Sequence, residues 1–178
     1  AGSALFDGSD DYITMGDISN LDSLTALSAS FWIKRNSYGS ASRNCVISKD
    51  NQLECLIKDT ASELTMAVGN DFQKFGVELS DATWTHIAMT FVGNGGSGND
   101  TRKLYVDGIL SATNTSGAIA NSGTSSDAFV IGGRASSNFT PANIAQVGIW
   151  NAALTQAQIQ SVMEKTFEEL TASEKTNL

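Results

Sequence analysis

Three aspartates close to the start of the chain form an acidic cluster that could hold a cation. Asp7, Asp10 and Asp11 surround Gly8 and Ser9, a turn that also offers carbonyl oxygens. Carboxylate and carbonyl oxygens are the ligands that Ca²⁺ prefers, so this spacing makes calcium the candidate ion. The spacing and the closing glutamate of an EF-hand are missing. The alternative is a solvated turn whose aspartates accept local hydrogen bonds.

The residues that could carry catalysis are few. His86 is the only histidine, and it lies inside an alternating apolar segment, which favours a structural strand histidine. The chain contains no GxSxG elbow and no pair of acids spaced along one strand as in glycosidases of related folds. Glu168 and Glu169 are neighbours on a predicted helix, so they point apart. The sequence therefore predicts no enzyme.

A glycine-rich stretch, residues 93–98, matches GxGxxG by letter. A dinucleotide site needs a helix directly after the glycines, because the helix N-terminus holds the pyrophosphate. Here residues 102–108 predict a strand that runs into a turn. The stretch is therefore predicted to be a hairpin loop.

The charge balance excludes several classes of partner. Nineteen acidic residues against eleven basic ones give a net charge of −8, which repels phosphate backbones and anionic lipid. No apolar run approaches the ~18 residues that a membrane span needs. We therefore expect no nucleic acid partner and no membrane insertion. Divalent cations and neutral sugars remain. The first residues carry no basic segment followed by an apolar one, so we expect no signal peptide within this stretch.

Two cysteines, Cys45 and Cys55, flank a predicted turn at Asp50 and Asn51. A hairpin centred there could bring the two sulfurs together as a disulfide. The alternative is a pair of reduced, half-buried thiols. The CxxC spacing of a structural zinc site is absent.

The elements that would position these groups are mostly strands. Short segments of alternating apolar residues, bounded by Gly, Asn, Asp and Ser, recur along the chain, as in 29–34, 64–68, 86–92 and 104–110. Asp107-Gly108 suits a tight hairpin turn. This pattern predicts an all-β fold, a sandwich or a barrel, with one short C-terminal helix.

The C-terminal helix has a clear start. Thr155 and Gln158 form a capping box. Apolar residues then follow at helical spacing, and we expect this stripe to dock on the sandwich edge or on a neighbouring module: Ile159, Val162, Met163, Phe167 and Leu170. A second capping box opens at Thr171 with Glu174. We therefore divide the chain into a sandwich, 1–155, and a helix with the start of a linker to a following module, 156–178.

The order of these segments resembles the laminin G-like, concanavalin A-like superfamily across nearly the whole chain. The matching pieces are an opening hairpin (4–13), Phe31-Trp32-Ile33-Lys34, Trp84-Thr85-His86-Ile87-Ala88, Leu104-Tyr105-Val106-Asp107-Gly108, and the closing segments 131–133, 144–150 and 153–155. The resemblance implies a two-sheet antiparallel β-sandwich (jelly roll) with loops gathered at one rim. It also implies that Trp32, Trp84 and Trp150 are mostly core.

The resemblance further implies a binding module for glycans or proteins, often with Ca²⁺ at the rim. This adds weight to Asp7, Asp10 and Asp11. Where many relatives carry two acids and an arginine, residues 142–150 have none, although Gln146 could offer an oxygen to the ion.

We expect glycan recognition on the loops, where stacking faces and hydrogen-bonding groups combine. The candidate contacts are Tyr38, Arg43, Asn70, Asp71, Phe72, Arg134, Asn138 and Phe139. An alternative is a structural virion or tail module that packs against copies of itself, because residues 163–178 resemble linkers in phage and marine-virus structural proteins. A glycan hydrolase is the third reading. The expected location is extracellular or on a virion surface, with a homo-oligomer or a tandem array as possible assemblies.

Overall fold

Two antiparallel sheets of six strands each form the fold in the computed structural model, which describes residues 2–37, 43–58, 63–135 and 137–178. In sheet A the order is β1 (Ala4–Phe6), β12 (Ala142–Trp150), β3 (Ala26–Arg35), β8 (Thr85–Val92), β9 (Thr101–Val106) and β10 (Ile109–Asn114). In sheet B it is β2 (Ile13–Thr14), β11 (Phe129–Ile131), β4 (Arg43–Lys49), β5 (Leu53–Lys58), β6 (Glu63–Val68) and β7 (Asp71–Glu78). The predicted two-sheet sandwich is confirmed.

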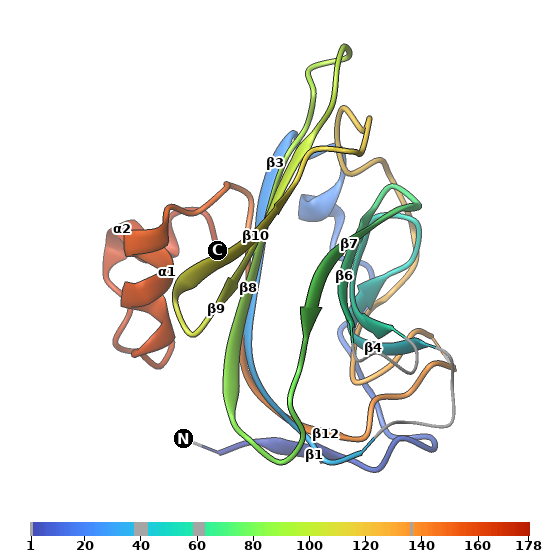
Figure 1. Ribbon diagram of the computed structural model, residues 1–178, viewed down its shortest axis with the longest axis vertical. Helices are drawn as coiled ribbons and strands as arrows, with labels where there is room; N and C mark the ends of the chain where they lie inside the picture. Colours follow the sequence, from blue (N-terminus) through green and yellow to red (C-terminus); the bar gives the residue numbers. More distant parts are fainter. Residues whose placement is uncertain (1, 38–42, 59–62, 136) are drawn as a thin grey trace.

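The core lies between the two sheets, which face each other in Figure 1. Phe31 and Ile33 of β3 and Cys55 and Ile57 of β5 all belong to it. Since side chains alternate along a strand, the residues between them point to the outer faces. Candidate ligand-binding groups are therefore those on the two outer faces and on the loops at their rims.

The opening segment is not a hairpin, in contrast to the prediction. β1 pairs with β12 in sheet A, whereas β2 pairs with β11 in sheet B. Each short strand forms the edge of a sheet and pairs with one neighbour, β12 or β11. The loop 7–12 therefore crosses from one sheet to the other and carries the acidic cluster at the rim.

Two short helices follow the last strand, where one was predicted. α1 (Gln156–Met163) begins at the predicted capping box of Thr155 and Gln158, and α2 (Ala172–Lys175) begins at that of Thr171 and Glu174. α1 ends before the predicted stripe does, and Phe167 is exposed. The reason is local, because the carboxylate of Glu169 accepts hydrogen bonds from the backbone and hydroxyl of Thr166, which competes with helix.

The helices cover part of the outer face of sheet A, and not an edge (Figure 1). Ile159 and Val162 of α1 pack against Ala88, Tyr105 and Trp150 of the sheet. Among the residues that the structure describes, no helix is long and apolar enough to cross a membrane.

The two cysteines are free thiols. Cys45 pairs with Leu56 across β4 and β5, whereas Cys55 is the next residue along β5 and faces the core. Successive residues of a strand point to opposite faces, so the two sulfurs lie on opposite sides of sheet B. Of the two alternatives, the structure therefore has the reduced thiols. Burial raises the pKa of both.

Candidate binding surface at the rim

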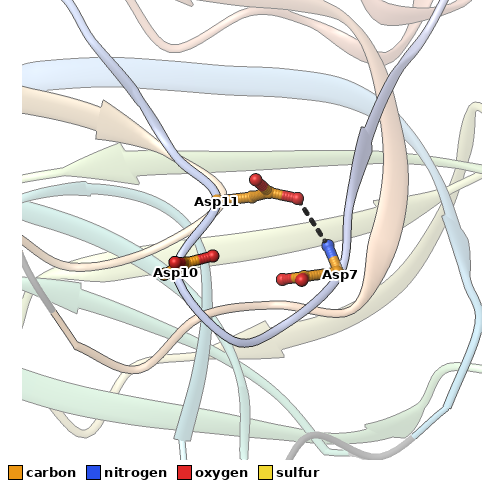
Figure 2. Close-up of side chains that lie close together, drawn as sticks. All are labelled: Asp7, Asp10 and Asp11. Atoms are coloured by element: carbon orange, nitrogen blue, oxygen red, sulfur yellow. Dashed lines mark hydrogen bonds between the residues drawn. The ribbon is translucent and has the colours of Figure 1, made fainter.

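The acidic cluster lies on the loop that joins β1 to β2. Oxygens of Asp7, Asp10 and Asp11 all lie within 4.8 Å of one another, and all three residues are exposed (Figure 2). The backbone N–H of Asp7 donates to Oδ2 of Asp11 at 3.1 Å, and that of Ser9 donates to Oδ1 of Asp7 at 2.7 Å. Within the described chain, no ion pair balances the three charges. The structure thus brings the three candidate ligand residues together.

These oxygens fit a calcium ion in their spacing. Ca²⁺ binds oxygens at 2.3–2.6 Å, so two ligands on opposite sides of an ion lie about 4.8 Å apart. The structure does not bring Gln146 to this cluster. Asp7 follows the Phe6–Ala142 pair at one end of the β1–β12 ladder, whereas Gln146 lies beyond the other end, past the Ala4–Ile144 pair.

An aromatic pair adjoins the acidic loop. The rings of Tyr12 and Phe139 stack with centroids 6.2 Å apart. A Cβ added at Gly8 would lie only 2.8 Å from Cβ of Pro141, so the loop 7–12 packs tightly on the segment around Phe139. Tyr12 is 46% exposed and follows Asp11 directly. The sequence analysis overlooked Tyr12, although its place beside the aspartates was a usable signal.

A second aromatic group lies on the outer face of sheet B. The guanidinium of Arg43 stacks over the ring of Phe72 at 4.6 Å from the centroid, and both residues are half-buried. Arg43 comes from β4 and Phe72 from β7, so the contact joins two strands that are not neighbours in sheet B. Both residues were predicted from the sequence to contact a ligand, and the structure brings them together.

Arg134 joins two carboxylates next to this stack. Its Nη2 bonds to Asp50, and its Nε lies 3.1 Å from Oδ1 of Asp50 and 3.4 Å from Oε1 of Glu54. Glu54 is buried, and burial raises its pKa even though Arg134 opposes the shift. Asp50 and Arg134 are partly exposed and can contact a ligand.

Two other predicted contacts, Asn70 and Asn138, bond to residues close to this group. The side-chain amide of Asn70 donates to Oδ1 of Asn51 at 2.8 Å, at the tip of the turn that carries Asp50. The carbonyl of Asn138 accepts the backbone N–H of Cys45 at 2.9 Å, close to Arg43 in the chain. Tyr38 lies outside the described residues.

Asp71 points elsewhere. Its Oδ2 bonds to the buried Arg102 at 3.2 Å, together with Asp100. The carboxylate thus belongs to an ion-pair network that links the two sheets. Asp71, a predicted ligand contact, thus makes a structural contact with Arg102.

Two candidate catalytic arrangements can be tested on this geometry. Asp50 and Glu54 are both bonded to Arg134, and Glu54 is 2% exposed, so this pair cannot flank a glycosidic bond. His86 is also buried, with Nε2 2.8 Å from Oγ of Ser30. Of these groups only Asp50 reaches solvent, and it is bonded to Arg134, so neither arrangement offers an exposed acid–base pair.

The tryptophans differ from the expectation. Trp150 is buried at 4% exposure, but Trp84 is 40% exposed and Trp32 is half-buried. All three side chains lie on the outer face of sheet A, since Phe31, Ile33 and Ile87 occupy the core face. α1 packs over Trp150, whereas Trp32 meets only the last residue of that helix through its indole N–H.

Comparison with known proteins agrees with this architecture. A family model described as the concanavalin A-like lectin/glucanases superfamily matches residues 7–160. A rat (Rattus norvegicus) protein, sushi, von Willebrand factor type A, EGF and pentraxin domain-containing protein 1, is 26% identical over 162 residues. The match covers 84% of this chain but 4% of the rat protein, so the chain spans a small part of that relative.

Two solved structures share the fold. A putative carbohydrate-binding protein from Bacteroides ovatus superposes with a TM-score of 0.70 at 19% identity, over 89% of this chain and 45% of that one. Domain 4 of the extracellular arabinanase AbnA from Geobacillus stearothermophilus, in complex with arabinotriose, gives 0.68 at 19% identity, over 90% and 75%. At this identity the similarity establishes the fold alone.

Proposed function

Because the chain belongs to the concanavalin A-like lectin/glucanases superfamily, we propose that it is a non-catalytic, extracellular carbohydrate-binding module. The glycan is recognised at the rim, by the acidic loop with Tyr12 and Phe139 and by the neighbouring outer face of sheet B. The named ligands of the two similar structures, a carbohydrate and arabinotriose, support this class of ligand. Asp50 and Glu54 are bonded to Arg134, and the other acids of this rim lie together on the loop 7–12. Neither set places two carboxyl groups on either side of a glycosidic bond, which argues against hydrolysis.

The single observation that carries the proposal is the exposed Tyr12 ring, stacked on Phe139 beside three carboxylates. A sugar has apolar C–H faces and a ring of hydroxyls. A half-exposed aromatic ring accommodates the first, and carboxylates or an ion that they hold bind the second. Asp50, Arg134 and the Arg43–Phe72 stack extend this surface with further hydrogen-bonding groups.

We expect Tyr12→Ala to weaken glycan binding by about tenfold or more, because stacked aromatic residues are typical hot spots. A glycan array identifies the best sugar, and isothermal titration calorimetry with and without Ca²⁺ measures the affinity of each variant. Leu110→Ala serves as the control, since Leu110 is 43% exposed on β10, on the other sheet. It should bind as the parent protein does.

Unchanged affinity in Tyr12→Ala would place the glycan elsewhere. If no sugar bound under any condition and light scattering showed a stable oligomer, the assembly function would replace the proposed one. Turnover of a glycan that a single carboxylate substitution abolished would instead establish a hydrolase.

We further propose that Asp7, Asp10 and Asp11 hold Ca²⁺. Asp10→Asn is the cleanest test, because Asp7 and Asp11 also accept backbone hydrogen bonds and Asp10 accepts none from the described residues. An exposed site of this type binds with a Kd of about 10⁻⁴–10⁻³ M. Calcium at ten times the Kd should then stabilise the protein by about 1.4 kcal/mol.

Thermal unfolding with increasing CaCl₂ checks this expectation, with MgCl₂ at the same ionic strength as the control. The stabilisation should disappear in Asp10→Asn. Equal stabilisation of the parent and Asp10→Asn proteins would contradict the site.

A further inference from the structure

One end of the outer face of sheet A is left uncovered by the helices. Cross-strand pairs on this face run from Trp150 with Ser28, under the helices, to Trp32 with His86 and Ala145. The indole Nε1 of Trp32 donates to the carbonyl of Met163, the last residue of α1, at 3.1 Å. Trp32 therefore marks the limit of the covered part, and Trp84 lies beyond it.

A hollow of about 270 Å³ lies in this uncovered region. Its lining comes from the residues before β1, the residue before β8, and strands β3 and β12: Gly2, Ser3, Trp32, Trp84, Ala145 and Gln146. The volume is close to the lower limit for small-molecule sites, which suits one or two sugar rings better than a large ligand. Two tryptophans, an amide and a hydroxyl thus meet in one depression.

Trp84 presents a flat apolar surface to solvent. It is 40% exposed, and Nζ of Lys34 lies 5.8 Å from its ring centroid. The cation–π contact steadies the ring. It also places a positive charge beside the hollow, so a cationic ligand would be repelled.

Gln146 is held in a strained conformation at the same place. Its φ is +50°, a region that residues other than glycine seldom adopt, and it lies where the β12–β3 register shifts between Ala145 and Gly148. A bulge of this kind re-aims a side chain. The amide of Gln146 is exposed and forms no hydrogen bond with any described residue, so its donor and acceptor remain available.

We propose that this end of sheet A is a second carbohydrate-binding surface. A neutral sugar ring stacks on Trp84, and its hydroxyls bond to the amide of Gln146 and to Lys34 and Ser3. The combination of a flat indole with an unpaired amide matches the two kinds of surface on a sugar. The chain's net charge of −8 disfavours acidic sugars. This second surface rests on the proposed function for its class of ligand alone, because its residues are separate from those of the rim.

The test is a sugar titration monitored by ¹H–¹⁵N spectra of the tryptophan indoles. The neutral probes are trisaccharides of arabinose, xylose, glucose and galactose, and the acidic probe is 3′-sialyllactose. Trp84→Phe assigns the Trp84 indole signal. We expect at least one neutral trisaccharide to shift that signal, with the signal of the covered Trp150 unchanged. Affinity from calorimetry should fall about tenfold or more in Trp84→Ala. It should fall less in Gln146→Ala.

The two surfaces are separated by their variants. In Tyr12→Ala, the shift of the Trp84 signal should persist. No shift with any neutral trisaccharide up to about 10 mM, a limit that still detects millimolar binding, would overturn the second surface. So would a shift with 3′-sialyllactose alone, or full affinity in Trp84→Ala. If Tyr12→Ala lost glycan binding and the sugar did not shift the Trp84 signal, the rim would stand as the binding site and this second surface would be excluded. Thermal unfolding of Trp84→Ala confirms that the variant is folded.

Discussion

Replacing Arg102 with methionine is expected to lower the free energy of unfolding by about 3–5 kcal/mol, the cost of breaking a buried ion pair. Arg102 is fully buried, and its Nε and Nη2 each lie 3.0 Å from one oxygen of Asp100. Nη1 donates to the carbonyls of Met66 and Asp71, and Nη2 also bonds to Oδ2 of Asp71. The side chain therefore joins β9 of sheet A to β6 and β7 of sheet B.

The cost arises from what remains after the substitution. The side chain of Asp100 is fully buried, and a Cβ added at Gly117 would lie 2.3 Å from its Oδ2, which also accepts the backbone N–H of Ile119 at 3.0 Å. Without the guanidinium, this carboxylate must stay charged in an apolar setting or take up a proton. The two carbonyls also lose their donor.

Urea denaturation of the parent protein and of Arg102→Met measures the difference. Lys103→Met is the matched control, because Lys103 is the next residue of β9 and is half-buried without an ion pair among the described residues. Its effect should stay within about 0.5 kcal/mol. A double variant, Arg102→Met with Asp100→Asn, should recover part of the loss. A loss below about 1 kcal/mol in Arg102→Met would show that the network contributes little.

The parts of the fold that depend on local pattern were predictable from the sequence. Phe31 and Ile33 alternate with polar or outward residues, and both lie in the core as the alternation predicts. The capping box of Thr155 and Gln158 starts α1 because its hydrogen bonds join residues three apart. Signals of this range need no knowledge of the tertiary fold.

The tryptophans show that the same alternation can contradict a family-based expectation. Trp84 and His86 have the opposite parity to Ile87 and Met89, so the strand pattern alone places Trp84 on the outer face. The resemblance instead implied a core position. Trp150 has the same outward parity and is nevertheless buried, because α1 folds back over it. That contact depends on tertiary structure, which the pattern does not encode.

The candidate site was predictable from the sequence only where its residues are close together in the chain. Asp7, Asp10 and Asp11 are close in sequence, and the structure brings their oxygens together. Asp71 is 31 residues from Arg102, and only the packing of β9 of sheet A against β6 and β7 of sheet B joins them. Asp71 was therefore predicted to be a loop residue, because nothing near it in the sequence indicates a buried arginine partner.

Acidification is expected to destabilise the protein through His86. The imidazole is 1% exposed, and burial lowers its pKa from 6.5 to about 4, an effect that the nearby Asp107 opposes only in part. Between these two pH values the unfolded chain binds a proton that the folded protein excludes. Stability is therefore fully present above pH 6.5 and falls as the pH drops towards about 4, by about 3 kcal/mol in total.

Urea denaturation of the parent protein and of His86→Gln, at several pH values from about 7.5 to about 4, isolates this contribution. Glutamine keeps a hydrogen-bonding group beside Ser30 but does not titrate. Carboxylates also titrate in this range, but they are common to both proteins, so their effect cancels in the difference. The parent should lose about 3 kcal/mol more than His86→Gln as the pH falls, and parallel curves would mean that the imidazole accepts a proton within the fold without cost.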